Sequence, residues 1–423
     1  MTTKSKLMLL SALTVACIVC CAATRVVWSE DAKPQADRPP IVLTDAAKKL
    51  HASALMIDGH NDMPWELRKQ ASSNFDKMDI SQPQPKLQTD IPRLRAGGVG
   101  AQFWSVWVPV ETGYRGEALS TTLEQIDLVK RMIARYPETF ELALTADDID
   151  RIHKEGKIAS LIGVEGGYSI EESLNTLEKL YKLGARYMTL THSDSLSWAD
   201  SATDTPKNNG LSPFGKEVVR KMNELGMMVD ISHVSAKTMH DAIDVSGAPV
   251  LFSHSSAKGV ADSSRNVPDD VLKRLPEKDG VVMVNFFSGF VVPSAAKTYI
   301  DSIDYERELK KKDSDPKHVE EEMKRWKKQH PYPRGTIHDL LDHIDHIAKV
   351  AGVKHVGIGS DFDGVSKLPT QLEDVSCYPY ITQGLLDRGY TEEQIRGILG
   401  GNVMRVFRGA EAYAAKHRQA SAK

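Results

Sequence analysis

The chain has 423 residues, of which 41% are hydrophobic and 26% are charged, and its formal net charge is −3. This composition is typical of a globular protein and excludes bulk disorder, and the length suits one large domain or two smaller ones. The weak net charge provides no basic footprint, so we expect no nucleic-acid partner.

The N-terminus has the pattern of an export segment. Lys4 and Lys6 are followed by an apolar run over 7–23 that ends in small residues. This pattern predicts a signal peptide or an N-terminal anchor over 1–24, followed by a proline-containing linker over 25–40. We therefore expect an exported protein, periplasmic or secreted, with a membrane tether if the segment is not cleaved.

From residue 41 to 418, apolar runs rich in β-formers alternate with amphipathic stretches. Helical patterns separate most of these runs, as at 123–135, 170–183, 213–225 and 336–350. The predicted strands are 55–58, 100–106, 158–164, 187–191, 227–231, 250–253, 281–286 and 355–359. Eight such units predict an α/β fold of the (β/α)8 TIM-barrel type. The competitor is an open doubly wound sheet, but no GxGxxG follows the first strand, which disfavours its dinucleotide-binding form.

One segment interrupts this alternation. Residues 295–333 are heavily charged and carry runs of Glu, Lys and Arg. We interpret the segment as a solvated helical insertion before the last strand. The alternative is a lid or a subunit contact near the barrel mouth.

Potential metal ligands lie at the ends of the predicted strands. His60 and Asp62 follow the first strand, and side chains at i and i+2 of an extended chain point to the same side. Later strand ends contribute Glu165, His192, His233, His254 and Asp361. Active sites of TIM barrels lie at these ends, and imidazoles with carboxylates but no Cys suit zinc or a similar divalent ion.

The residues around these ligands resemble a known family. The segments are Asp58-Gly59-His60-Asn61-Asp62, Val164-Glu165-Gly166-Gly167, Leu190-Thr191-His192, Ile231-Ser232-His233-Val234, Ser253-His254-Ser255, Ser264-Arg265-Asn266-Val267-Pro268-Asp269 and Gly359-Ser360-Asp361-Phe362-Asp363-Gly364. They resemble the membrane (renal-type) dipeptidases, the M19 peptidases of the amidohydrolase superfamily. The resemblance runs in order from about residue 45 to about 410.

The resemblance implies a binuclear zinc centre. His60, Asp62 and Glu165 would hold one Zn²⁺, and Glu165, His233 and His254 would hold the other, with Glu165 and a water or hydroxide as bridges. A carboxylate has two oxygens and can span two ions about 3.5–4 Å apart.

Three further roles come from the same resemblance. Asp361 would accept the proton of the attacking water and pass it to the departing amine. His192 would assist where the carbonyl oxygen gains charge. Arg265 would bind the free carboxylate of the substrate through its planar fork of donors.

The family resemblance implies a zinc dipeptidase that hydrolyses free dipeptides and tolerates a D-residue at the C-terminal position. Another amidohydrolase-type activity, N-acyl amino acid deacylation or lactone hydrolysis, is the alternative. A non-enzymatic metal-binding receptor is disfavoured, because a binding protein needs no proton shuttle such as Asp361.

The chain departs from the animal members of this family. Its last ten residues are polar and basic, without the apolar tail of a lipid-anchor signal. Three of its four cysteines lie in the predicted export segment, which leaves Cys377 alone. We therefore expect an exported bacterial member without a disulfide-linked dimer, and a non-covalent homodimer stays open.

Overall fold

The computed structural model describes residues 38–313 and 315–421. The export segment predicted over 1–24, and residues 25–37 of the predicted linker, lie outside the described residues. Over the described ranges, no helix combines the length and the apolar character that crossing a bilayer requires.

The described residues contain nine parallel strands, and eight of them close into a barrel. The sheet order is β2-β1-β9-β8-β7-β6-β5-β4-β3, and an additional pairing of β2 with β4 closes it. The strands are β1 Met56–Asn61, β2 Val99–Ser105, β3 Phe140–Leu142, β4 Ile158–Glu165, β5 Ala185–Thr189, β6 Met228–Asp230, β7 Val250–Phe252, β8 Val281–Val284 and β9 Val356–Ile358. The predicted (β/α)8 barrel is thus confirmed.

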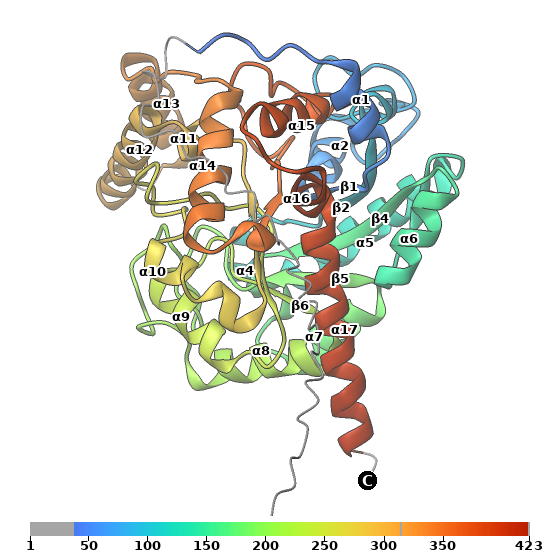
Figure 1. Ribbon diagram of the computed structural model, residues 1–423. Helices are drawn as coiled ribbons and strands as arrows, with labels where there is room; N and C mark the ends of the chain where they lie inside the picture. The colour runs from blue at the N-terminus through green and yellow to red at the C-terminus, as the bar shows by residue number, and fades with distance from the viewer. Residues whose placement is uncertain (1–37, 314, 422–423) are drawn as a thin grey trace, which may run out of the picture. The chain divides into compact units, whose positions relative to one another are not determined.

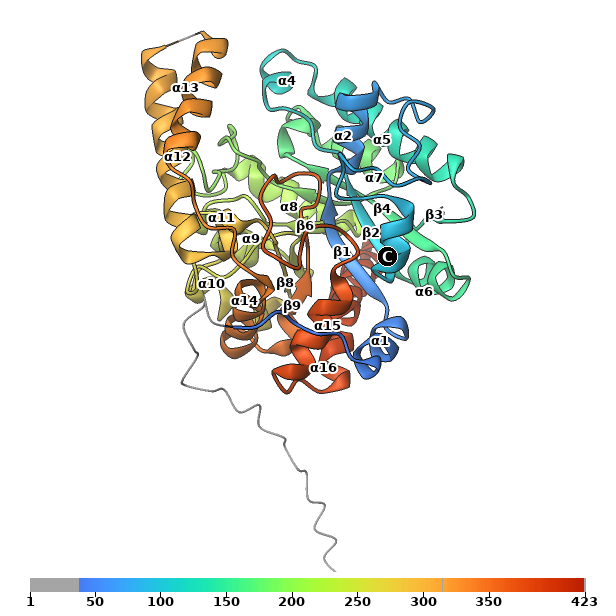
Figure 2. The ribbon, with the colours of Figure 1, turned by 90° about the horizontal axis from the view of Figure 1, so that it is seen from above.

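Helices surround the strands (Figure 2). They are α1 Asp45–Ala52, α2 Met63–Ala71, α3 Ile91–Ala96, α4 Glu111–Tyr114, α5 Ala118–Arg135, α6 Ala146–Lys154, α7 Leu174–Lys182, α8 Pro213–Leu225, α9 Ala236–Val245, α10 Asp269–Leu272, α11 Ser288–Val291, α12 Pro293–Lys312, α13 Pro316–Gln329, α14 Ile337–Val350, α15 Tyr378–Asp387, α16 Glu392–Arg396 and α17 Asn402–Ser421. Short turns of other helix types are η2 Gly167–Ile170, η3 Leu275–Lys278, η4 Val353–His355 and η5 Gly397–Gly401.

Local sequence explains where these helices begin. Ser212 caps α8 by accepting a hydrogen bond from the backbone N–H of Gly215, and Pro213 occupies the first turn. Thr336 and Asp339 form a capping box at the start of α14. Such caps satisfy N–H groups that have no partner within the helix.

The barrel strands are buried on both faces, so their sequences read as apolar runs rather than alternating ones. Phe407 and Ala410 of α17 belong to one buried apolar cluster with strand residues that include Ile57, Leu161 and Val281. One end of the barrel is therefore filled with apolar side chains, and the polar residues gather at the opposite end.

The ninth strand is an addition to the prediction. β3 has three residues and pairs with the first half of β4, from Phe140 opposite Ile158 to Leu142 opposite Ser160. The second half of β4 pairs with β5 instead. β3 therefore adds to the rim of the barrel without widening it.

The charged segment forms two helices between β8 and β9. Figures 1 and 2 show α12 and α13 side by side. Ion pairs one turn apart, Lys310 with Glu306 and Lys324 with Glu320, support these polar helices. The predicted helical insertion before the last strand is present, and α12 also lines the cavity described below.

His343 of α14 is a buried structural residue. Its Nδ1 accepts a hydrogen bond from the backbone N–H of Ala257 at 2.9 Å, and its Nε2 donates one to the carbonyl of Val291 at 3.0 Å. The ring is therefore neutral in the folded protein. Burial lowers the pKa of His343 to about 4.

Candidate active site

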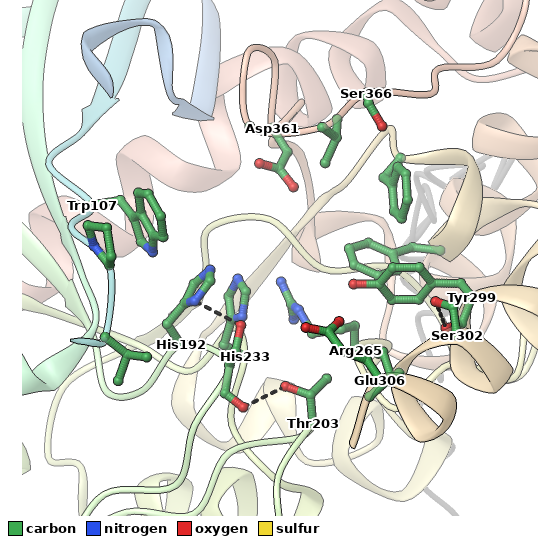
Figure 3. A pocket seen from close by; sticks show the side chains of 18 of the residues that line it. Trp107, His192, Thr203, His233, Arg265, Tyr299, Ser302, Glu306, Asp361 and Ser366 are labelled. Atoms are coloured by element: carbon green, nitrogen blue, oxygen red, sulfur yellow. Dashed lines mark hydrogen bonds between the residues drawn. The ribbon is translucent and has the colours of Figure 1, made fainter. Parts of the chain in front are cut away.

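The polar strand ends open into one cavity of about 1380 Å³. Asp62, Glu165, His192, His233, Arg265 and Asp361 line it. Figure 3 shows the side chains of His192, His233, Arg265 and Asp361 pointing into this space. The two remaining predicted ligands, His60 and His254, are almost completely buried. The structure thus brings all eight predicted site residues together.

Glu165, the last residue of β4, lies at the centre of the cluster. Its Oε1 lies 3.0 Å from His233 Nε2 and 3.2 Å from His254 Nε2. Its Oε2 faces the other way, 3.4 Å from His60 Nε2, which in turn lies 3.2 Å from Asp62 Oδ2. The two oxygens of one carboxylate therefore face two different sets of ligand atoms, as a bridging ligand requires.

His60 has its imidazole fixed by a buried phenol. Tyr187 of β5 donates a hydrogen bond from its hydroxyl to the carbonyl of Gly59 at 3.1 Å. The same hydroxyl lies 2.8 Å from His60 Nδ1, so it accepts the Nδ1 proton. In the neutral ring, His60 Nε2 is then left with a lone pair, and this buried atom has no hydrogen-bond partner among the described residues. A nitrogen in that state is suited to bind a metal ion.

His254 is oriented by an analogous chain of hydrogen bonds. Asp230, the last residue of β6, accepts hydrogen bonds from the hydroxyls of Ser253 at 2.6 Å and Thr189 at 2.5 Å. Because the Ser253 proton goes to Asp230, the Ser253 hydroxyl accepts the Nδ1 proton of His254 at 2.7 Å. The Nε2 lone pair of His254 therefore points at Glu165.

The charges of the cluster also fit a metal site. Burial lowers the pKa of His233 and of His254 well below the usual range, which keeps both rings neutral. Burial also disfavours the charge on Glu165, but the imidazoles around it, His60 foremost, outweigh this effect and hold the pKa of its carboxyl well below its usual range. Burial opposes a charge on His60, but the groups around it, Tyr187 and Glu165 foremost, raise the pKa of this ring well above its usual range. A bound metal ion would replace that proton and balance the carboxylates in its place. The nitrogen and oxygen donors suit zinc and similar first-row divalent ions.

His60 and Asp62 meet because the chain stays extended through Asn61, which places side chains two residues apart on one side. β1 continues to Asn61, which also bridges to Phe362, and Asp62 then begins α2 as its N-cap. The prediction placed His60 just beyond the strand, whereas it lies within the strand. The second pairing at Asn61 explains the longer strand.

Asp361 faces the cluster from the end of β9. Its Oδ2 accepts a hydrogen bond from Asn285 Nδ2 at 2.8 Å, and Figure 3 shows the carboxylate pointing into the cavity. Its neighbour Ser360 is anchored to the buried carboxylate of Asp58 through both its N–H and its hydroxyl. Asp361 has a φ of 66°. Burial, with Asp62 and Glu165 close by, raises the pKa of Asp361 to about 8.

His192 lies on the loop between β5 and α8. Its Nε2 is 3.9 Å from Glu165 Oε1, and its Nδ1 is 3.0 Å from the hydroxyl of Ser193. Its ring packs against Trp107 and His233 with centroid distances of 5.5 and 4.3 Å. Because a fifth of its side chain is exposed, His192 can contact a ligand in the cavity.

Arg265 lies in the segment after β7 and is 2% exposed. Its Nη2 makes one long hydrogen bond, 3.4 Å, to the carbonyl of His254. Its Nε and Nη1 are buried and have no partner among the described residues. A buried guanidinium with unpaired donors next to the cluster is arranged to receive an anion.

Three residues of the site were missed from the sequence. Tyr187 acts through hydrogen bonds to residues far away in the chain, and no local pattern indicates it. Asp230 and Asn285 had a signal, because each is a polar residue at the end of a strand. The predicted strand over 281–286 concealed the signal of Asn285, since the strand ends at Val284.

Comparisons with known proteins identify the family of the chain. The model of the membrane dipeptidases, peptidase family M19, matches residues 44–421. An uncharacterised dipeptidase of the fission yeast Schizosaccharomyces pombe is 43% identical over 372 residues, which cover 84% of this chain and 81% of that protein.

Solved structures share the fold. The probable dipeptidase PvdM from Pseudomonas aeruginosa has a TM-score of 0.77 and 25% identity, over 87% of this chain and 98% of that one. A metallopeptidase from Rhodobacter sphaeroides, solved with a phosphinate mimic of the dipeptide L-Ala-D-Ala, has a TM-score of 0.70 and 22% identity, over 84% of this chain and 99% of that one.

The family match covers nearly all of the described residues, and the fission yeast relative matches over most of both chains. Three groups of side chains in this cluster could each hold a metal ion: His60 with Glu165 and His254, Glu165 with His192 and His233, and His60 with Asp62 and Asp361. The chain belongs to the membrane dipeptidases, peptidase family M19, and is a metallo-dipeptidase.

Proposed function

We propose that the protein is a binuclear zinc dipeptidase that hydrolyses the peptide bond of free dipeptides. The observation that carries the proposal is the carboxylate of Glu165, whose two oxygens face separate ligand sets. His60 and Asp62 would hold one zinc ion with Glu165 Oε2, and His233 and His254 would hold the other with Glu165 Oε1.

Two zinc ions held there would polarise the scissile carbonyl and make a water acidic enough to attack it near neutral pH. Asp361 would transfer the protons. Cations bound beside it would lower the raised pKa of this carboxyl, so that Asp361, held by Asn285, can accept the proton of the attacking water and pass it to the departing amine. His192 reaches the same space from the opposite wall and donates to the carbonyl oxygen as that atom gains charge.

Arg265 selects the free C-terminal carboxylate of the substrate. Its unpaired Nε and Nη1 can form a bidentate, charge-assisted contact with a carboxylate. A substrate that continued beyond its second residue would leave this buried charge unpaired, which is costly. The arrangement therefore favours dipeptides over longer chains.

We further propose that the C-terminal position tolerates a D-residue. The Rhodobacter sphaeroides metallopeptidase of the same fold is liganded with a mimic of L-Ala-D-Ala. Arg265 would fix the carboxylate of either stereoisomer, because the guanidinium contacts the carboxylate and not the side chain.

A substrate panel tests the proposal. Zinc-loaded protein is assayed on L-Ala-L-Ala, L-Ala-D-Ala, their C-terminal amides, an N-acyl amino acid and a lactone. We expect the two free dipeptides to have the highest kcat/KM and the amides to fall at least tenfold, because a charged hydrogen bond is lost. Faster turnover of the N-acyl amino acid or the lactone would assign the alternative amidohydrolase activity instead.

We also propose that residues 1–24 direct export. The full chain has a mass of 46.8 kDa. Intact-mass measurement of protein isolated from a producing bacterium should show loss of this segment, and fractionation should place the mature protein outside the cytoplasm. A full-length cytoplasmic product would contradict export, and a full-length membrane-bound product would indicate the tether.

A further inference from the structure

The surroundings of Arg265 show how an anion must approach it. The ring of Phe290 covers its guanidinium, with Cζ 5.1 Å from the ring centroid. The carbonyl of His254 lies on another side. These groups enclose the guanidinium on two sides, and Arg265 lines the cavity, from which an anion would approach.

Tyr299 reaches the same part of the cavity from α12, the first helix of the charged insertion. Its ring makes edge contacts with Phe287 and Phe290, at centroid distances of 5.2 and 5.4 Å, which fix its orientation. Its hydroxyl makes no hydrogen bond with any of the described residues. Figure 3 shows this hydroxyl pointing into the cavity on the side of Arg265.

The charges around Tyr299 support a role in binding. The charge of Arg265 lowers the pKa of Tyr299 and the charge of Asp361 raises it, so both groups lie near enough to influence the phenol electrostatically. Burial raises the pKa of Tyr299 to about 12, and the phenol is therefore a neutral donor at physiological pH.

The helix that carries Tyr299 is held in place across the cavity. Arg307 Nη2 donates a hydrogen bond at 2.7 Å to the carbonyl of Thr203, on the loop that also carries His192. Ser302 donates to the carbonyl of Tyr299 at 2.7 Å. The phenol is thus positioned before a ligand arrives, which lowers the entropic cost of binding.

We propose that Tyr299 is a substrate-binding residue whose hydroxyl donates a hydrogen bond to the same carboxylate that Arg265 binds. An ionised carboxylate accepts about four hydrogen bonds, of which the guanidinium fork uses two. A phenol adds a third, charge-assisted bond without adding a second charge. This inference rests on the proposed function, and it gives the charged insertion a part in substrate recognition.

Tyr299→Phe tests the inference, with Tyr305→Phe as its matched control. Tyr305 lies on the same helix, stacks on Trp326 at 5.7 Å and does not line the cavity. For L-Ala-D-Ala, we expect Tyr299→Phe to raise KM about tenfold, because a hydrogen bond to a charged group is lost, and to leave kcat within about twofold. For the C-terminal amide, Tyr299→Phe should raise KM by about threefold or less. Tyr305→Phe should have the kinetic constants of the wild type on both substrates.

A double variant distinguishes shared binding from a purely structural effect. If both residues bind one carboxylate, the effects of Tyr299→Phe and Arg265→Lys on KM should be non-additive. The KM of the double variant should then rise by less than the product of the two single increases. Equal KM values for Tyr299→Phe and Tyr305→Phe on the free acid, or additive losses, would overturn the inference.

The proposed function can fail separately. If the wild type turns over neither dipeptide, the free dipeptide and its C-terminal amide stay intact during the measurement. Calorimetric titration of each compound into each of the two variants, Tyr299→Phe and Tyr305→Phe, then gives four Kd values. A selective loss of free-acid affinity in Tyr299→Phe would then still support the inference, and equal affinities in the two variants would overturn it.

Discussion

The hydroxyl of Tyr187 provides a sharp test of how the protein prepares a metal ligand. Tyr187→Phe removes one buried oxygen, which now accepts the Nδ1 proton of His60 and donates to the carbonyl of Gly59. Both partners stay buried in the variant, because His60 has no exposed surface and Gly59 is buried as well. The imidazole loses the hydrogen bond that fixes its tautomer and orientation.

The expected loss is large enough to measure. Removing the hydrogen-bond partner of a metal-bound histidine typically weakens metal affinity about 10- to 100-fold. At about 1.4 kcal/mol for each tenfold change, this is about 1.4–2.8 kcal/mol of binding free energy. The two unpaired groups at His60 and Gly59 also destabilise the metal-free protein by about 1–3 kcal/mol.

Zinc affinity is measured by competition with a chromophoric chelator, and stability of the metal-free protein by urea unfolding. Tyr390→Phe is the control, because the Tyr390 hydroxyl donates to the carboxylate of Asp345 at 2.8 Å, away from the cluster. The control should lose stability but keep its zinc affinity. Wild-type zinc affinity in Tyr187→Phe, or an equal loss in both variants, would refute the reasoning.

Three further predictions concern other parts of the molecule. Asp361→Asn should keep both metal ions, by elemental analysis, but lose kcat by about 10²–10⁴, and a near-normal kcat would exclude Asp361 as the proton carrier. The pKa of His343 is about 4 in the folded state and about 6.5 in the unfolded state, so its contribution to stability is present above pH 6.5 and is lost as pH falls towards 4. Between pH 7.5 and 5, the wild type should therefore lose about 2 kcal/mol more than His343→Gln in urea unfolding, and equal losses would contradict this account. In Gly359→Ala, the new Cβ would lie 1.9 Å from the carbonyl oxygen of Ser253, so we expect about 3 kcal/mol of destabilisation. Gly401→Ala, with its nearest atom at 3.4 Å, should unfold like the wild type, and similar behaviour of the two variants would show that the close approach does not matter.

The fold could be predicted from sequence because its strands are short, fully buried and separated by amphipathic helices. All eight predicted strands are present, and the predictions differ from the structure only in the residues at which strands begin and end. β3 was missed because three residues, Phe140–Leu142, give no periodic signal. The longer β1 depends on pairing with Trp104 and Phe362, which lie far away in the sequence.

The candidate site follows the same division. Residues directly at strand ends, such as Glu165 and Asp361, could be found because parallel strands deliver their last residues to one place. The groups that orient these residues could not be found from the sequence. Tyr187 is 127 residues from His60, and its hydroxyl matters only because the barrel brings the two strands together. Tyr299 lies in a segment whose charges indicated a solvated surface, although α12 turns this aromatic residue towards the cavity.

The central claim is that one carboxylate, Glu165, holds two metal ions between separate ligand sets. Anomalous diffraction at the zinc absorption edge, from crystals of the zinc-loaded protein, tests it most directly. The account predicts two anomalous peaks about 3.5–4 Å apart. One should lie between Glu165 Oε2, His60 and Asp62, and the other between Glu165 Oε1, His233 and His254. A single peak in crystals of fully active enzyme, or two peaks that Glu165 does not bridge, would contradict the claim.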